Sequence, residues 1–147
     1  MPIVVQPPVV TMLVVLSAWL IHAVLGPWQI ILHAPVLGGT LVALGFSVML
    51  WARILFTSRK TTLFVGQESA HLVSDGPFRF SRNPMYIGVL VSLLGVALWI
   101  GTWPMYVALF FTFFVFHFFH IPHEEQMLRE SFGERYLVYA KDVRQWL

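Results

Sequence analysis

The chain has 147 residues, of which 58% are hydrophobic, 16% aromatic and 11% charged, whereas soluble domains carry charge on about a quarter of their residues. So few polar residues cannot cover the surface of a soluble globule, which excludes a soluble core with a single membrane anchor. The length predicts one domain over residues 1–147. The absence of cysteine excludes disulfides, thiolate metal sites and a cysteine nucleophile, and the net charge of +2 indicates no nucleic-acid partner.

Four apolar segments are predicted to span a membrane, at residues 9–25, 36–52, 85–100 and 103–121. Each approaches the ~20 residues that a hydrocarbon core requires. Helices are expected because unpaired backbone groups cannot face lipid. The fold class is therefore all-α integral membrane, with four transmembrane helices. The first residues lack a basic region, so no cleavable signal peptide is expected.

The breaks between these segments carry turn and interface signals. Gly26-Pro27-Trp28 and Ala34-Pro35 bracket the first connection, and Gly101-Thr102-Trp103-Pro104 predicts a tight helical hairpin. Tryptophans stand at segment ends, as in the aromatic belt of membrane proteins, at Trp28, Trp51, Trp99 and Trp103.

All sixteen charged residues fall within two blocks, 53–82 and 124–144. Four spans would put the second connection and the tail on one side of the membrane, and their arginines and lysines make that side the cytoplasm. We therefore expect a multi-pass protein of a prokaryotic plasma membrane, with cytoplasmic N- and C-termini and membrane lipids around it.

The third predicted helix has a clear start. Asn83 is a good N-cap and Pro84 suits the first helical position. Gly88, Ser92 and Gly95 then form a stripe of small residues, which would let a neighbouring helix approach closely.

The tail predicts two short amphipathic helices, at 124–132 and 134–141, separated by Gly133. Glu125 and Arg129 are spaced to pair on the first of them. Apolar residues on one side of the tail, Trp146 among them, predict that it folds back against the membrane helices.

Two polar stretches are the most specific sequence motifs in the chain. Residues 71–88 read HLVSDGPFRFSRNPMYIG, and residues 123–139 contain HEEQML, FGERY and a further tyrosine. Each has a plain alternative: the first is a turn-rich loop delivering a capped helix, and the second is an amphipathic helix with solvated acids.

Together and in this order, the two stretches resemble the isoprenylcysteine carboxyl methyltransferase and phospholipid N-methyltransferase superfamily of integral-membrane enzymes. That family has a Leu-Val-x-x-Gly-x-Tyr-x-x-x-Arg-His-Pro-x-Tyr-x-Gly element before a membrane helix, then a Glu-Glu pair leading into Phe-Gly-x-x-Tyr-x-x-Tyr. The resemblance covers about residues 70–144. It implies S-adenosylmethionine as cofactor, S-adenosylhomocysteine as product, and a lipophilic small molecule or lipid as methyl acceptor.

The resemblance also implies a site, in a pocket covered by the tail helices. Positions that match the family's cofactor contacts are Ala70, His71, Leu72, Val73, Phe78, Asn83, Pro84, Met85, Tyr86 and Glu124. The family's substrate-side arginine falls on His120, its histidine before proline on Asn83, and its tyrosine on Phe78. No residue is assigned a catalytic role, since in-line methyl transfer needs alignment more than acid–base help.

The residue types suit this cofactor. A glutamate at the membrane edge can receive an ammonium group or ribose hydroxyls, and the aromatic faces of Tyr86 and Phe78 can take a sulfonium or adenine. No Gly-x-Gly-x-x-Gly is present, so a soluble Rossmann methyltransferase site is not expected.

Two other functions remain open. Sterol reductases are similar in the same half and bind a nicotinamide nucleotide, although they usually carry an acidic residue where Val89 follows Gly88. A haem-binding or non-catalytic protein is the other, since His117 and His120 could share a helix face and intramembrane histidines are functional candidates. Against a metal or haem, Pro122 is expected to break the helix before His123, so no metal site is predicted.

Overall fold

The computed structural model describes residues 7–26, 31–58 and 72–147. These residues form helices joined by turns, with no strand among them. The long helices are α1 (Pro7–Leu25), α2 (Pro35–Ser58), α3 (Pro84–Ile100) and α4 (Trp103–Val115). The remaining elements are the 3-10 turn η2 (Gly76–Arg79), the π-helical turn η3 (Phe116–His120), α5 (Ile121–Phe132) and α6 (Glu134–Asp142).

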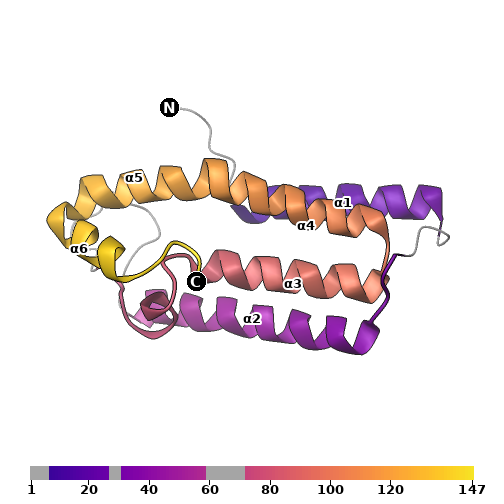
Figure 1. Cartoon of the computed structure of the whole chain (residues 1–147), viewed down its shortest axis with the longest axis horizontal. Coiled ribbons are helices and arrows are strands. Elements are labelled where there is room, and N and C mark those ends of the chain that lie inside the picture. The colour runs from indigo at the N-terminus through magenta and orange to yellow at the C-terminus, as the bar shows by residue number, and fades with distance from the viewer. Residues whose placement is uncertain (1–6, 27–30, 59–71) are drawn as a thin grey trace.

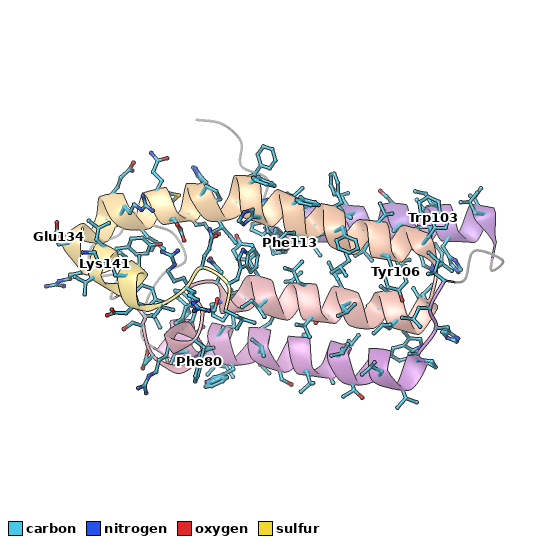
Figure 2. All side chains as sticks on the ribbon, viewed as in Figure 1. Phe80, Trp103, Tyr106, Phe113, Glu134 and Lys141 are labelled. Atoms are coloured by element: carbon cyan, nitrogen blue, oxygen red, sulfur yellow. The ribbon has the colours of Figure 1, made fainter. Side chains whose placement is uncertain are left out.

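The four long helices lie side by side along their length (Figure 1). Helix α3 packs against both α2 and α4, while α1 packs against α4. Both described charged regions, η2 with the start of α3 and α5 with α6, lie at the end opposite the α3–α4 turn (Figure 1). The side chains show the same division, since nitrogen and oxygen atoms gather around Glu134 and Lys141 at that end (Figure 2).

Three helical stretches are long and apolar enough to cross a membrane: α1, α2 and the continuous run Trp103–Phe132. Helix α3 is apolar but has only 17 residues, so the third predicted span is shorter than these three stretches. Helix α2 runs six residues past its predicted end at 52, because Arg53 does not interrupt the helix. The composition of these helices is that of an integral membrane protein.

The predicted small-residue stripe on α3 is confirmed as the contact with α2. A Cβ atom added at Gly88 would lie 2.6 Å from the Gly45 carbonyl oxygen, and one at Gly95 would lie 2.6 Å from that of Gly38. These obstacles are backbone atoms, so the two helices touch main chain to main chain. We call this contact, at Gly38, Gly45, Gly88 and Gly95, the glycine seam.

The predicted hairpin between α3 and α4 is also confirmed. Gly101 takes the left-handed conformation (φ 81°) and ends α3, and α4 begins two residues later. The Gly101 carbonyl accepts a hydrogen bond from the Ile31 amide at 2.8 Å, and the Tyr106 hydroxyl donates to the Leu32 carbonyl at 2.8 Å. Described residues of the first connection are thereby fixed to this end; Pro27 and Trp28 lie outside the described residues.

The prediction that Pro122 breaks the fourth helix is wrong. The helix runs on from α4 through η3 into α5, and the residues just before Pro122 form a π turn. A proline lacks an amide hydrogen and clashes with the carbonyl four residues earlier. The wider π turn absorbs that conflict without ending the helix.

Candidate functional site

A hydrogen bond joins the two polar motifs. The Tyr86 hydroxyl, in the first turn of α3, donates to Glu124 Oε1 on α5 at 2.6 Å. Pro84 fixes the start of α3 and so sets the direction in which Tyr86 projects. Residues 38 positions apart in the sequence therefore meet at one point.

Aromatic side chains of the π turn pack on the Tyr86 side of this pair. The Phe116 ring packs edge-on against Tyr86, with centroids 4.5 Å apart, and His120 packs edge-on against Phe116 at 5.8 Å. Phe116 is fully buried, whereas Tyr86 and His120 are 7% and 6% exposed. Glu124 keeps part of its side chain at the surface. The site is thus a carboxylate at the edge of an aromatic cluster.

The C-terminal strap, residues 143–147, crosses the start of α3 (Figure 1). Three hydrogen bonds attach it: the Arg82 amide donates to Arg144 O at 2.9 Å, Ser81 Oγ to Gln145 O at 3.2 Å, and Asn83 Nδ2 to Gln145 O at 3.0 Å. Asn83 occupies the predicted N-cap position, but its side chain does not cap α3 because the amide is bonded to the strap. The capping prediction is therefore wrong for the side chain.

An ion pair holds α5 against the start of α3. Arg82 lies 3.1 Å from Glu125, and both side chains are largely buried, at 15% and 11% exposed. The predicted pair of Glu125 with Arg129 is present at 3.6 Å, but Arg129 is more than half exposed. Burial, and then the charge of Glu125, raise the pKa of the adjacent Tyr136 hydroxyl. Glu125 is therefore a structural residue between two elements.

A second apolar cluster supports the loop before α3. Val73 and Phe78 pack with Ala52 of α2, and the Phe78 ring meets Phe56 edge-on at 4.9 Å. Met85 packs against the same cluster. The Phe78 ring therefore packs on α2, whereas the Tyr86 ring packs on Phe116.

Tyr139 of α6 also supports this loop. Its hydroxyl donates to the Phe78 carbonyl at 2.7 Å. Burial, together with the charge of neighbouring Tyr136, raises the pKa of Tyr139, so the hydroxyl keeps its proton and stays a donor. Helix α6 is thereby fixed onto the first motif.

The predicted site residues divide into three sets. Tyr86, Glu124 and His120 lie around one aromatic cluster, with Asn83 and buried Pro84 just before it. Val73, Phe78 and Met85 belong to the cluster on α2, and Leu72 is half-buried at the start of the described loop. Ala70 and His71 lie outside the described residues.

The chemistry of this donor set fits the predicted cofactor. A carboxylate held by a tyrosine hydroxyl can accept hydrogen bonds from an ammonium or from ribose hydroxyls, and the neighbouring aromatic rings suit a sulfonium. Within the described ranges, no group of three or more His, Asp or Glu is arranged to hold a metal ion. His117 Nδ1 instead accepts a hydrogen bond from Trp146 Nε1 at 3.2 Å.

Sequence reasoning missed the strap, the role of Phe116 and the pairing of Arg82 with Glu125. The only sequence signal for the strap was an aromatic residue near the chain end. The pairing of Arg82 had no signal, because spacing rules apply within one helix and its partner is on another element.

Comparisons with known proteins agree with the motifs. A family model described as phospholipid methyltransferase matches residues 33–135. The chain is 35% identical over 97 residues to protein-S-isoprenylcysteine O-methyltransferase A of Arabidopsis thaliana, covering 63% of this chain and 48% of that protein. It is 30% identical over 122 residues to phosphatidyl-N-methylethanolamine N-methyltransferase of Emericella nidulans, covering 80% of this chain and 59% of that protein.

The chain spans about half the length of the curated relatives that it matches. No solved structure matches the chain at comparable significance.

Proposed function

The chain belongs to the phospholipid methyltransferase family, and we propose that it is a membrane methyltransferase that moves a methyl group from S-adenosylmethionine to a lipophilic acceptor. The observation that carries this proposal is the Tyr86–Glu124 hydrogen bond at 2.6 Å. It brings the two motifs of the family resemblance to a single point, as a shared cofactor site requires.

The proposed cofactor roles are as follows. S-adenosylmethionine supplies a methyl group already activated by its positive sulfur. Glu124 accepts hydrogen bonds from the ammonium or ribose, while Tyr86 fixes the carboxylate and offers a ring face. Phe116 excludes water behind Tyr86. The protein's contribution is alignment and desolvation, with no proton transfer demanded of these residues.

The proposed acceptor is lipophilic because the site adjoins helices of membrane-spanning length and the aromatic π turn. His120, rather than arginine, stands at the position that the resemblance assigns to the substrate side. A neutral imidazole offers one donor, whereas a guanidinium offers a charged fork. We therefore propose that the acceptor's nucleophile is an amine, a thiol or another uncharged group.

The acceptor proposal is tested by comparing a prenylcysteine analogue with an uncharged lipophilic amine and thiol at pH 8. We expect weak or undetectable methylation of the free carboxylate. Efficient methylation of the prenylcysteine analogue would contradict the assignment of His120 and favour a carboxylate acceptor.

The proposed topology has four spans, with both termini and both charged blocks in the cytoplasm. Because the chain contains no cysteine, single cysteines report on it cleanly. Cysteines at Ser58 and Gln145 should react with an impermeant thiol reagent only after cells are opened, and one at Thr102 should react from outside. The reverse pattern would contradict the orientation.

Calorimetric titration tests the cofactor itself. The purified wild-type protein should bind S-adenosylhomocysteine at one site per chain. Glu124→Gln removes a charge-assisted hydrogen bond of about 1.5–3 kcal/mol, so the affinity should fall about 10- to 150-fold. Glu130→Gln is the matched control, because Glu130 is an exposed glutamate of the same helix whose carboxylate accepts a hydrogen bond from the Gln126 side-chain amide.

Equal losses of affinity in the two variants would show that Glu124 is not the cofactor carboxylate. Binding of a nicotinamide dinucleotide, with no response to S-adenosylmethionine or its product, would replace the methyltransferase with a reductase. A haem absorption band in the purified protein would favour the haem-binding alternative.

A further inference from the structure

Trp146 lies between α3 and α4, next to the proposed site. The bonds from Ser81, Arg82 and Asn83 to the strap hold the backbone of the two residues that precede it. Its side chain packs onto the cluster of Tyr86, Phe116 and Ile121. Trp146 therefore touches the same aromatic cluster that carries the Tyr86–Glu124 pair.

A second set of contacts ties Trp146 to the fourth helix. Its ring lies 5.3 Å from the ring of Phe113 and 6.2 Å from that of His117, centroid to centroid. The indole Nε1–H donates to His117 Nδ1 at 3.2 Å. An indole that bridges two helices and also makes a directed hydrogen bond is held in one orientation.

The surrounding helices explain why a large side chain is needed here. Helices α3 and α4 meet at the Gly101 turn and diverge toward the charged end (Figure 1). Phe113 projects from α4 toward the side on which α3 and the strap lie (Figure 2). The strap brings Trp146 to this diverging region from a distant part of the chain, and the indole fills space that the two helices leave between them.

We propose that Trp146 is a specificity-determining residue, the wall between α3 and α4 that limits the bulk of a lipophilic acceptor approaching Tyr86 and Glu124 from the bilayer. This inference rests on the proposed function. An acceptor with an unbranched chain next to its nucleophile passes beside the indole. An acceptor branched at that point meets the ring and requires the strap to move.

Access to the site can be measured without knowing the acceptor. Ile121 is a fully buried member of the cluster that Trp146 contacts, and the chain has no native cysteine. In Ile121→Cys protein in nanodiscs, N-dodecylmaleimide should react slowly. Adding Trp146→Ala should speed the reaction severalfold, while adding Trp19→Ala should not, because Trp19 is an exposed residue of α1.

Selectivity is measured with dodecylamine, dodecanethiol and their 2-methyl-branched analogues, using S-adenosylmethionine as donor. Trp146→Ala, with native Ile121, should raise the branched-to-unbranched ratio of kcat/KM by on the order of 10-fold, since a methyl-sized clash discriminates by that order. Trp146→Phe keeps one aromatic ring in the packing and loses the N–H and part of the indole's volume, so it serves if the alanine variant does not fold. It should give smaller changes of the same sign.

Unchanged maleimide reactivity or an unchanged kcat/KM ratio in folded Trp146 variants would overturn the inference, even if S-adenosylhomocysteine binds normally. If none of the four acceptors is methylated, the effect of Trp146→Ala on the rate of the maleimide reaction alone decides whether the inference stands. Failure of the wild-type protein to bind S-adenosylhomocysteine would instead overturn the proposed function, and the acceptor role of Trp146 with it.

Discussion

The glycine seam and the charged end are built on opposite principles. At the seam, α2 and α3 touch through backbone, and the side chains at Gly45 and Gly88 are absent so that this can happen. At the charged end, directed side-chain contacts join separate elements, such as Tyr86 to Glu124 and Arg82 to Glu125. The seam depends on what is missing, and the charged end depends on which atoms are present.

This difference predicts how each region responds to substitution. Close backbone contact is intolerant of any added atom, because the main chain on both sides cannot move aside cheaply. A directed polar contact tolerates a change in side-chain size, but removing one partner costs the free energy of that hydrogen bond or ion pair. Stability should therefore be most sensitive at the seam, and ligand affinity at the charged end.

The largest effect is expected for Gly45→Ala. The added Cβ would lie 2.7 Å from the Ser92 amide nitrogen and closer still to the Gly88 carbonyl oxygen. Because both of these atoms belong to the backbone, we expect the free energy of unfolding to fall by at least about 3 kcal/mol, the upper end of the range for overpacked cores. Thermal unfolding in detergent measures it.

Gly39→Ala is the matched control on the same helix. Its Cβ would meet the Trp99 ring at 3.5 Å, an ordinary contact, and alanine favours the helix by about 0.5–1 kcal/mol over glycine. Its stability should be unchanged or slightly raised. If Gly45→Ala unfolds at the same temperature as Gly39→Ala, then the seam is looser than the structure shows.

The seam and the charged end also differ in how far the sequence predicts them. Gly88, Ser92 and Gly95 repeat at helical spacing, so one short window predicts a close helix contact. The continuous apolar segments likewise predict the long helices, and Gly133 predicts the break between the tail helices. These features depend on neighbours along the chain, which a sequence displays directly.

Contacts at the charged end join residues far apart in the sequence. The Asn83 amide bonds to a carbonyl 62 residues away, and any sequence window shows Asn83 only as a helix cap. The prediction from Pro122 failed for a related reason. Proline on its own breaks a helix, but here the π turn before it accommodates the ring. Only the family resemblance indicated that Glu124 lies near the start of α3.

A smaller loss of stability is expected for Glu125→Gln. The amide removes the negative charge facing Arg82, whose side chain is 15% exposed and keeps some access to water. We expect a loss of roughly 1–3 kcal/mol, with a similar loss for Arg82→Gln. The double variant should lose less than the sum of the two, and thermal unfolding of all three measures the coupling.

Glu130→Gln again provides the control, since its exposed bond to Gln126 lies within one helix and is worth at most about 0.5 kcal/mol. Additive losses for Glu125→Gln and Arg82→Gln would show that the ion pair does not hold α5 to α3. The charged end would then depend on the strap and the aromatic cluster alone.

The smallest effect, and the most selective, is expected for Tyr86→Phe. The variant keeps the ring against Phe116 but loses the hydroxyl that donates to Glu124 at 2.6 Å. Glu124 is partly exposed and can bind water instead, so stability should fall by only about 0.5–1.5 kcal/mol. Without this bond the carboxylate is less well positioned for the cofactor. If binding loses the same free energy as stability does, the affinity for S-adenosylhomocysteine should fall about 2- to 12-fold.

Tyr106→Phe separates a loss of stability from a loss of binding. Its hydroxyl donates to the Leu32 carbonyl at 2.8 Å, a hydrogen bond of similar length at the opposite end of the bundle (Figure 2). Removing it should lower stability by a similar amount and leave the calorimetric affinity unchanged. If both variants weaken binding equally, the loss comes from general loosening of the helices. If neither does, Glu124 holds its position without Tyr86, and the charged end is less dependent on directed contacts than the comparison with the seam implies.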